Sequence, residues 1–340
     1  MDYRDAGVDI DAAEAAKRRI AALARGTFNA GVLTEIGSFG GMFRPDLARF
    51  RDPVLVASAD GVGTKLHVAN QVGVHDTVGY DLVAHCVNDI LVQGAVPLFF
   101  LDYIALGSMD TAKVEAVVSG LARACREFGC PLLGGETAQM PGTYAPDDYD
   151  LAGFIVGVVD RGRALTGARV REGDVLLGLP SAGLHTNGYS LARKVLLETM
   201  GLTVKSHLPE LGATVGQALL WPHRGYLAAL EPLLERDKLR AMAHITGGGF
   251  PGNIPRVLPE GLAARVRRGS WEVPPLFRLI QKGGQVSDEE MFRTFNMGVG
   301  MIVVVAPDDL HEVEHSLERR GETSFVIGSL VAGSGVVYED

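Results

Sequence analysis

The stretch VLVASADGVGTKL, residues 54 to 66, is the most informative part of the chain because a β-type run ends there on residue types that bind phosphate. Residues 54–59 predict a strand, and the hexapeptide DGVGTK follows at once. Glycine lets backbone N–H groups approach an oxyanion, lysine supplies a positive charge, and aspartate can hold a hard cation. The spacing is not that of a Walker loop, and an Asp-Gly turn can also be ordinary loop chemistry. The stretch therefore predicts a phosphate and Mg²⁺ site, with a structural turn as the alternative.

Composition restricts the class of protein. The 340 residues are 47% hydrophobic and 21% charged, which is enough for a sizeable core and for two domains. The net charge of −9 argues against a nucleic-acid-binding surface. Cys86, Cys125 and Cys130 lack C-x-x-C spacing, which argues against a disulfide or zinc framework. We find neither a signal-peptide pattern nor an apolar run of membrane-spanning length, so we expect a cytoplasmic protein that binds no membrane.

Strand-like and helix-like segments alternate in the first half. Residues 12–23 predict a helix, and the glycine-dotted residues 26–42 fit either a lid over a ligand or a surface arm. Residues 111–128 predict a helix with an apolar core stripe, and residues 131–133 a strand that ends before Gly134-Gly135-Glu136-Thr137. Glycines and an acid thus follow a strand twice, at Asp60 and at Glu136. This repetition predicts two loops that converge on one anionic, metal-bearing ligand.

The helix predicted over residues 81–93 carries a polar face. On a 3.6-residue period its acids, imidazole and amide fall on one side, and these are Asp81, His85, Asn88 and Asp89. A solvated stripe is the usual explanation for such a face. The following strand, residues 94–103, is apolar throughout, which favours an internal site instead.

The second half repeats the pattern beyond a boundary between residues 166 and 173, which predicts domains at 1–168 and 169–340. A strand at 174–179 leads through PSAGLHTNG to a helix at 189–200. Polar residues therefore precede a helix start, where N–H groups favour phosphate, although Thr186 or Asn187 can also be a plain helix cap. A second strand-to-glycine joint is AHITGGG at 243–249. Asn253 and Asn296 are either ligand contacts or satisfied buried amides.

Taken together, these blocks resemble the phosphoribosylformylglycinamidine cyclo-ligase family, also called the aminoimidazole ribonucleotide synthetases. The matching blocks are DYRDAGVD at 2–9, DGVGTKL at 60–66, HDTVGYDLVAHCVNDILVQGAVPLFFLDY at 75–103, GGETAQMPGTY at 134–144, GLHTNGYSLARK at 183–194, AHITGGGFPGNIPRVLP at 243–259 and FNMGVGM at 295–301. Selenophosphate synthetase and thiamine monophosphate kinase share the architecture but lack most of these blocks.

The resemblance implies an α+β, two-domain PurM-like fold. The N-terminal domain would contribute strands to a barrel at a homodimer interface, and the C-terminal domain would be an α/β sandwich. The implied reaction is the ATP-dependent cyclisation of formylglycinamidine ribonucleotide to 5-aminoimidazole ribonucleotide, with release of ADP and phosphate, in de novo purine biosynthesis. ATP and Mg²⁺ are the implied cofactors.

The resemblance also assigns roles to matched positions. The metal ligands are Asp60, Asp89 and Glu136. The ATP-binding residues are Asp60, Gly61, Val62, Gly63, Thr64, Lys65, Asp81, Asn88, Asp89, Gly134, Gly135, Glu136 and Thr137. The substrate-binding residues are Ser181, His185, Thr186, Asn187, Gly188, Thr246, Gly247, Gly248 and Gly249. Lys65 acts on the phosphates, and His185 or His244 moves a proton, because imidazole titrates near neutral pH.

The chain departs from the family pattern at three positions. Thr186 replaces a serine and keeps the hydroxyl, whereas Gln139 replaces a glutamate and loses a charge. His85 stands where methionine is common, which makes it a neighbour of the site and not a catalytic candidate. The alternatives are a small-molecule kinase of the same architecture and a non-catalytic nucleotide-binding homologue.

Overall fold

The computed structural model describes residues 10–340, without the side chains of residues 10–13, 15 and 16, so the family-like block at 2–9 lies outside the described residues. The chain forms two compact units. The first runs to Ile90 and includes Val96–Asp160, and the second comprises Leu91–Ala95 and Arg161–Asp340. The division thus falls after Asp160, where a strand ends, and earlier than the boundary predicted between residues 168 and 169. Among the described helices, we find none long and apolar enough to cross a membrane.

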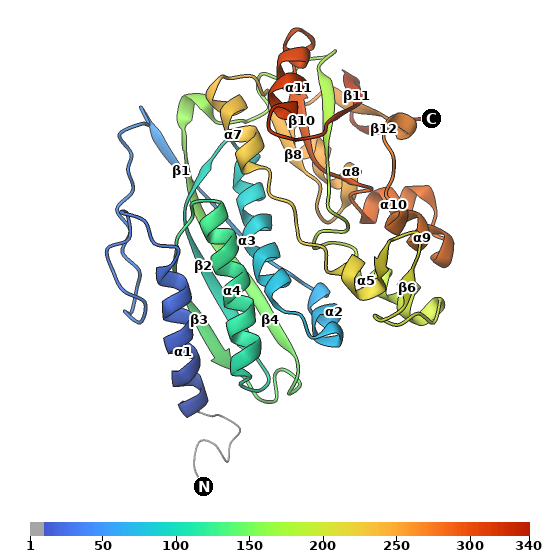
Figure 1. The fold of residues 1–340 in the computed structure, drawn as a ribbon. Helices are drawn as coiled ribbons and strands as arrows, with labels where there is room; N and C mark the ends of the chain where they lie inside the picture. The colour runs from blue at the N-terminus through green and yellow to red at the C-terminus, as the bar shows by residue number, and fades with distance from the viewer. Residues whose placement is uncertain (1–9) are drawn as a thin grey trace. The chain divides into compact units, whose positions relative to one another are not determined.

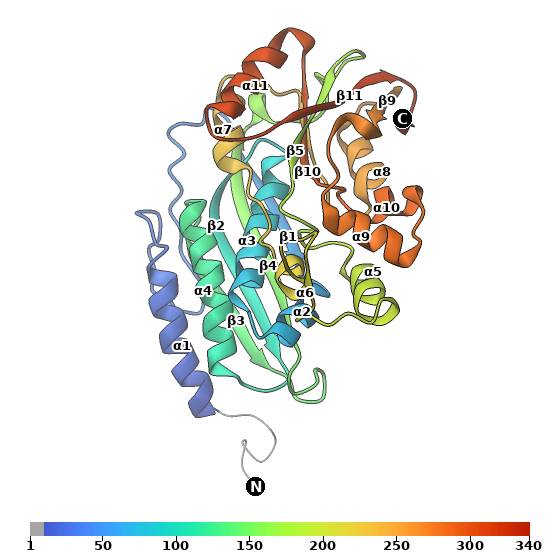
Figure 2. The ribbon, with the colours of Figure 1, turned by 45° about the vertical axis from the view of Figure 1, so that its right-hand side comes forward.

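The first unit is a four-stranded sheet with helices on one face (Figures 1 and 2). Its strands, in spatial order, are β1 (Pro53–Gly61), β4 (Tyr149–Asp160), β2 (Val96–Leu106) and β3 (Leu132–Gln139). β4 is antiparallel to both neighbours, and β3 is parallel to β2. The helices are α1 (Ile10–Arg25), α2 (Lys65–Val72), α3 (Asp76–Leu91) and α4 (Thr111–Glu127). α1 lies beside α4, and α2 begins soon after β1 ends.

Helix α4 shows why this sequence folds locally as predicted. The Asp110 carboxylate accepts hydrogen bonds from the N–H groups of Ala112 and Lys113, which caps the helix start. The predicted apolar stripe is confirmed, and its buried residues are Val114, Val117, Val118, Leu121 and Cys125. Burying such a stripe against the sheet is the main source of a helix's stability in a protein.

The other face of this sheet carries apolar side chains at the surface. Along β1 and β4 the side chains alternate between the two faces. Leu55 is 64% exposed and Phe154 is 46% exposed, whereas Val56 and Ile155, on the helix-covered face, are buried. The pairing of Ala59 with Phe154 continues the exposed apolar surface across both strands. We refer to this surface as the open face.

The second unit is built on a six-stranded sheet. The strands, in spatial order, are β12 (Gly335–Glu339), β9 (Leu262–Arg267), β11 (Phe325–Ala332), β5 (Val175–Pro180), β10 (Val299–Val305) and β8 (Ala241–His244). The helices are α5 (Tyr189–Arg193), α6 (Val215–Leu219), α7 (Leu227–Glu235), α8 (Gly249–Asn253), α9 (Pro275–Gly284), α10 (Asp288–Thr294) and α11 (Leu310–Glu318), and β6 (His207–Leu208) pairs with β7 (Ala213–Thr214). α7 packs beside α11, and α8 beside α10 (Figure 2).

Two predicted elements differ from the structure. The strand predicted over residues 131–133 continues as β3 to Gln139, so Gly134 to Thr137 lie in a strand and not in a loop. The helix predicted over residues 189–200 starts as α5 and continues as a π-helix, Lys194–Thr199. The other helices and strands predicted above are present, with bounds that differ by a few residues.

Candidate functional site

A carboxylate and imidazole cluster forms where β1 ends. Asp60 lies near the end of β1, and α3 presents His85 and Asp89 to it. The His85 Nε2 atom lies 2.7 Å from Asp60 Oδ2 and 3.5 Å from Asp89 Oδ2. The Ser58 hydroxyl donates to Asp89 over 3.2 Å. The structure thus brings together two predicted metal ligands, and His85 contacts both of them although the resemblance reduces it to a neighbour.

The charges in this cluster reinforce one another. Burial favours the neutral form of Asp60, but the hydrogen bond and charge of His85 outweigh it and hold the pKa of Asp60 below its ordinary value. Burial also disfavours the charged form of His85, yet the hydrogen bond to Asp60 and the nearby carboxylates raise its pKa. Two carboxylates and a hydroxyl are hard oxygen donors of the kind that Mg²⁺ prefers, so the cluster fits such an ion.

Lys65 and Asp81, both predicted to bind ATP, are buried within the first unit. Their side chains form an ion pair, with 2.7 Å between Lys65 Nζ and Asp81 Oδ2, and both are 0% exposed. Burial lowers the pKa of Lys65, and Asp81 acts in the opposite direction. The lysine ammonium therefore neutralises a buried carboxylate inside the first unit. This geometry does not support its assignment to the ATP phosphates. Asn88 is buried as well.

Glu136 does not join Asp60 and Asp89 within the first unit. Asp60 aligns with Gly153, Asp102 and Gly135 across the sheet, from the β1 edge to the β3 edge. Three strand spacings separate the edges, roughly 14 Å. Glu136 pairs with Tyr103 on the open face, whereas Asp60 faces α3. The Asp60 and Glu136 segments, predicted to converge, therefore do not meet within this chain.

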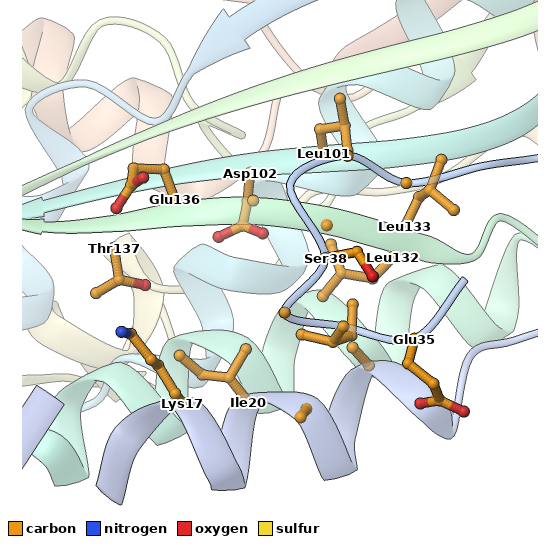
Figure 3. Close-up of a pocket in the computed structure, with 18 of the residues that line it drawn as sticks. Lys17, Ile20, Glu35, Ser38, Leu101, Asp102, Leu132, Leu133, Glu136 and Thr137 are labelled. Carbon is orange, nitrogen blue, oxygen red and sulfur yellow. The ribbon is translucent and has the colours of Figure 1, made fainter. Parts of the chain in front are cut away.

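Glu136 instead lines a cavity of about 640 Å³ between α1, residues 35–41 and the strands β2 and β3 (Figure 3). This volume is in the range of small-molecule sites. Apolar side chains such as Ile20, Leu101 and Leu133 form part of its wall. Its polar lining includes Lys17, Ser38, Asp102, Glu136 and Thr137, and all four residues of the predicted Gly134 to Thr137 segment contribute. Figure 3 shows Lys17 extending from α1 toward Thr137.

Asp102 is one of the polar cavity residues, with Lys17 and Ser38, that were not predicted from the sequence. It lies within an apolar strand, and burial raises its pKa to about 7. A Cβ atom on the neighbouring Gly135 would overlap the Asp102 carboxylate, so the glycine leaves room for this acid. One available signal was the lone acid in the apolar run PLFFLDY.

In the second unit, the loop after β5 is held by internal hydrogen bonds. The Ser181 hydroxyl lies 3.0 Å from Gly183 O and 2.9 Å from Asn296 Oδ1, and the Asn296 amide donates to the same Gly183 carbonyl. Gly188 caps α5 through its left-handed backbone, so neither Thr186 nor Asn187 is the cap. His185 is also left-handed, with φ of 60°. Backbone strain in a non-glycine residue is common at functional positions.

The two predicted substrate-binding segments meet in this unit. A Cβ atom on Gly247 would lie 3.1 Å from Asn187 Oδ1, so the glycine turn passes beside the loop after β5. The Asn253 amide donates to the carbonyls of Thr246, Gly247 and Gly249, with 2.8 Å to the last. Asn253 and Asn296 are thus satisfied buried amides that shape the segments around them.

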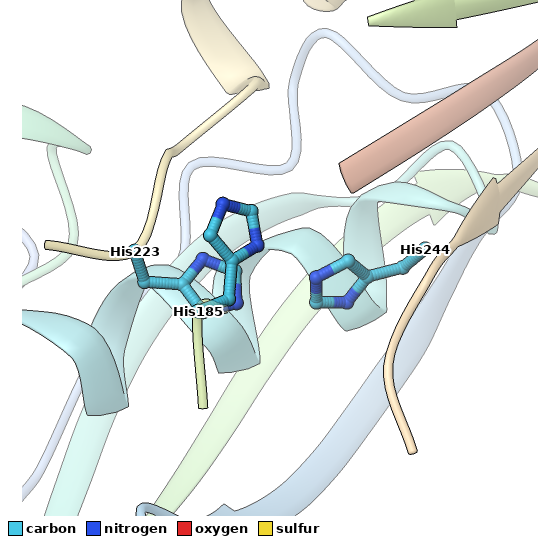
Figure 4. Close-up of side chains that lie close together, drawn as sticks. All are labelled: His185, His223 and His244. Carbon is cyan, nitrogen blue, oxygen red and sulfur yellow. The ribbon is translucent and has the colours of Figure 1, made fainter. Parts of the chain in front are cut away.

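Three buried histidines lie together beside these segments (Figure 4). The rings of His185 and His223 stack with 3.9 Å between their centroids, and the His244 ring stands edge-on to His223 at 5.2 Å. His185 and His244 were predicted, but His223 was not. Its loop, between α6 and α7, follows a helix instead of a strand and has one glycine, Gly225, instead of the glycine runs that marked the other segments.

Family models match most of the chain. The AIR synthase related protein N-terminal domain matches residues 45–159, and the C-terminal domain of the same name matches residues 171–340. Known structures share the fold. The thiamine-monophosphate kinase from Stenotrophomonas maltophilia K279a superposes with a TM-score of 0.68 at 20% identity, covering 95% of each chain. E. coli HypE gives 0.68 at 19% identity, covering 95% of this chain and 93% of its own.

Curated relatives match more closely. Phosphoribosylformylglycinamidine cyclo-ligase of Brevibacillus brevis is 50% identical over 337 residues, which are 99% of this chain and 97% of the relative. The protein of that name from Citrifermentans bemidjiense is 51% identical over 330 residues, 97% of this chain and 95% of the relative. With both domain matches in order and half of all aligned residues identical, the chain belongs to the phosphoribosylformylglycinamidine cyclo-ligase family.

Proposed function

We propose that this chain converts formylglycinamidine ribonucleotide to 5-aminoimidazole ribonucleotide with ATP, in purine biosynthesis. The observation that carries the proposal is the 50% identity to a named cyclo-ligase over 99% of the chain. Because the match covers nearly the whole of both chains, this chain has counterparts of both domains of the named enzyme. The pathway's soluble nucleotide substrates and its use of ATP also support the cytoplasmic location predicted from the sequence.

The chemistry needs positioning and charge neutralisation more than a covalent intermediate on the protein. An amide oxygen is a poor leaving group, and transfer of the ATP γ-phosphoryl group to it creates a good one. The substrate's amidine nitrogen then attacks the activated formyl carbon, phosphate leaves, and the imidazole ring closes. Groups fixed in advance around the developing charges supply the catalysis of such steps.

In the first unit, we propose that the cavity lined by Gly134 to Thr137 receives the nucleotide. Its apolar wall suits a purine base, and its polar lining offers hydrogen bonds to a ribose. Asp60 faces α3, which carries Asp89, on the side of the sheet away from Glu136. The two carboxylates would hold Mg²⁺ there, an ion that supplies charge neutralisation for phosphate when bound. His85 would keep both carboxylates oriented. We assign Lys65 and Asp81 to the support of the turn between β1 and α2, because their charges are fully buried.

In the second unit, we propose that the loop after β5 and the glycine turn bind the substrate. Asn187 lies against Gly247, so both segments can contact one ligand through side-chain and backbone groups. His185 would move the amidine proton. Its Nε2 atom lies 3.2 Å from the Ala182 nitrogen, and a backbone N–H can only donate. The Nε2 atom is therefore unprotonated in this arrangement.

We also propose a homodimer formed through the open face of the first unit. Leu55 and Phe154 are large apolar side chains exposed on neighbouring strands. A surface of this kind marks an interaction site. The family resemblance supplies the occupant, a second copy of the same sheet that completes a barrel.

One assay tests the reaction against the kinase alternative. Purified protein is given Mg²⁺ and ATP, with and without formylglycinamidine ribonucleotide, while ADP and 5-aminoimidazole ribonucleotide are followed together. We expect ADP release that depends on the substrate and matches the imidazole product one to one. ADP without the imidazole product would identify a kinase or ATPase, and absence of turnover would identify a binding homologue.

An Asp60→Asn variant tests the metal assignment in the same assay. We expect turnover to fall by at least about a hundredfold, because the site loses one of two metal-binding carboxylates. Asp147→Asn, in an exposed loop of the same unit, serves as the control and should keep the parent's rate. Near-normal turnover by a folded Asp60→Asn protein would remove Asp60 from the metal site.

A further inference from the structure

Three histidines of the second unit lie close together, and the proposed reaction uses one of them, His185. His185 comes from the loop after β5, His223 from the loop before α7, and His244 from the end of β8. Their exposed fractions are 1%, 1% and 5%. We propose that this cluster, shown in Figure 4, binds a divalent transition-metal ion of the zinc class.

The distances allow a shared ion after a small adjustment. One nitrogen from each ring lies within 4.8 Å of the nitrogens offered by the other two. Around a tetrahedral ion with metal–nitrogen bonds near 2.0–2.1 Å, neighbouring ligand atoms lie about 3.3 Å apart. The nitrogens therefore need to draw together by at most about 1.5 Å, which rotation of the side chains can supply.

A hydrogen bond holds the His223 ring in a form that ligates metals. His223 Nδ1 lies 3.1 Å from the Arg224 carbonyl oxygen. A carbonyl only accepts, so Nδ1 carries the proton and the neutral ring has an unprotonated Nε2 atom. Metal-bound histidines commonly donate their second N–H to such a carbonyl. His185 Nε2 is also unprotonated, but its lone pair accepts from the Ala182 N–H over 3.2 Å. Binding an ion through this atom therefore requires the ring to rotate out of that hydrogen bond.

The packing around His185 fixes its backbone and leaves room for its ring. Tyr189 donates to the His185 carbonyl over 3.1 Å and fixes the left-handed backbone. On β10, Gly300 leaves space for the ring, since a Cβ atom there would lie 2.6 Å from His185 Cε1. A fixed backbone limits the conformational freedom that this residue loses when an ion binds.

The donor set selects the class of ion. Three imidazole nitrogens suit Zn²⁺, Co²⁺, Ni²⁺ and Cu²⁺, whereas Mg²⁺ and Ca²⁺ prefer oxygen ligands. Three protein ligands leave a coordination position open for water or another small ligand. This ion is thus chemically distinct from the Mg²⁺ that we assign to the carboxylates of the first unit.

One consequence rests on the proposed function. His185 would move the substrate's proton, and a metal-bound Nε2 atom cannot accept one. Zn²⁺ should therefore inhibit turnover in the presence of excess Mg²⁺. Binding itself is measured without substrate or ATP, so failure of the proposed reaction would leave the metal-binding test intact.

The test uses the full chain without a polyhistidine tag, freed of metal by a chelator and then titrated with Co²⁺. We expect one equivalent of Co²⁺ to give the intense visible bands of a four- or five-coordinate ion, and one equivalent of Zn²⁺ to abolish them. A His223→Asn variant should lose more than about 100-fold in Co²⁺ affinity. Loss of a residue that only supports a ligand costs roughly 10- to 100-fold. His207→Asn is the matched control because it removes an exposed histidine of the same unit, and it should bind like the parent.

Circular dichroism and the thermal midpoint without metal establish that each variant is folded. If His223→Asn does not fold, His244→Asn takes its place, and the nitrogen hyperfine pattern of the Cu²⁺-loaded parent identifies imidazole ligands directly. Weak octahedral bands in the parent would overturn the proposal. Bands from thiolate ligation, or unchanged binding by a folded His223→Asn or His244→Asn protein, would overturn it as well.

Discussion

At the scale of residues, a substitution in the buried pair of Lys65 and Asp81 distinguishes a structural role of Lys65 from a role in phosphate binding. Lys65→Met leaves the Asp81 carboxylate without its ion-pair partner in the interior. We expect the free energy of unfolding to fall by about 3–5 kcal/mol, the usual cost of breaking a buried ion pair from one side. Urea denaturation measures this loss.

The double variant Lys65→Met with Asp81→Leu is the matched comparison for that experiment. Removing both charges should recover much of the lost stability, because no buried charge is left unpaired. If Lys65 binds phosphate instead, the single variant would keep the parent's stability and show a raised KM for ATP. That result would restore the role predicted from the sequence.

Asp102 gives a pH dependence with a definite sign. Its pKa is about 7 in the folded protein against an ordinary 3.8, so between these pH values the native state holds a proton that the unfolded chain has released. The stability from this group is complete below the ordinary pKa and is lost as the pH rises through about 7. The loss is at most roughly 4 kcal/mol. Asp102→Asn should flatten this part of the stability curve in urea denaturation from about pH 4 to about pH 8.

Asp147→Asn is the control for the pH experiment, since it changes an exposed carboxyl of the same unit. It should keep the downward slope of the parent. An Asp102→Asn protein with the parent's slope would show that other groups produce the pH dependence and that the Asp102 carboxyl titrates near its ordinary value.

At the scale of elements, strand β10 supports the histidine loop through a glycine. A methyl group at Gly300 would run into the Tyr226 hydroxyl and into His185. We expect Gly300→Ala to lower the free energy of unfolding by about 1–3 kcal/mol, the usual cost of overpacking a core, and to lower turnover by displacing His185. Gly269→Ala is the control because that position has open space. Unchanged turnover in Gly300→Ala would separate His185 from the reaction.

The elements themselves were largely predictable because their signals are local. The stripe of α4 repeats at helical spacing, and the apolar run of β1 stops at a glycine turn. Strand β3 was predicted too short because Gly134 and Gly135 are typical of a loop. Gly135 of β3 is required because its partner on β2, Asp102, needs the space that a side chain would fill. Single-sequence reasoning has no access to that pairing.

At the scale of the whole molecule, the site was predictable only where its residues are close in sequence or share a helix face. His85 and Asp89 lie one helical turn apart and meet Asp60 in the structure. Glu136 looked equivalent to Asp60, but two strands lie between their strands and the side chains face opposite sides of the sheet. Strand order arises from long-range pairing, and the spacing of motifs does not encode it.

The open face gives the last prediction, which concerns assembly. If a second copy covers this face, a charge placed there is buried on association. The free-energy cost of removing that charge from water exceeds what an interface of ordinary size can offset. We expect Phe154→Glu to convert a dimer to a monomer in sedimentation equilibrium. Val337→Glu is the matched control, since Val337 is 49% exposed on β12 of the second unit against 46% for Phe154. A parent chain that is monomeric at every concentration, or a Phe154→Glu protein that stays dimeric, would show that the open face is not the homodimer interface.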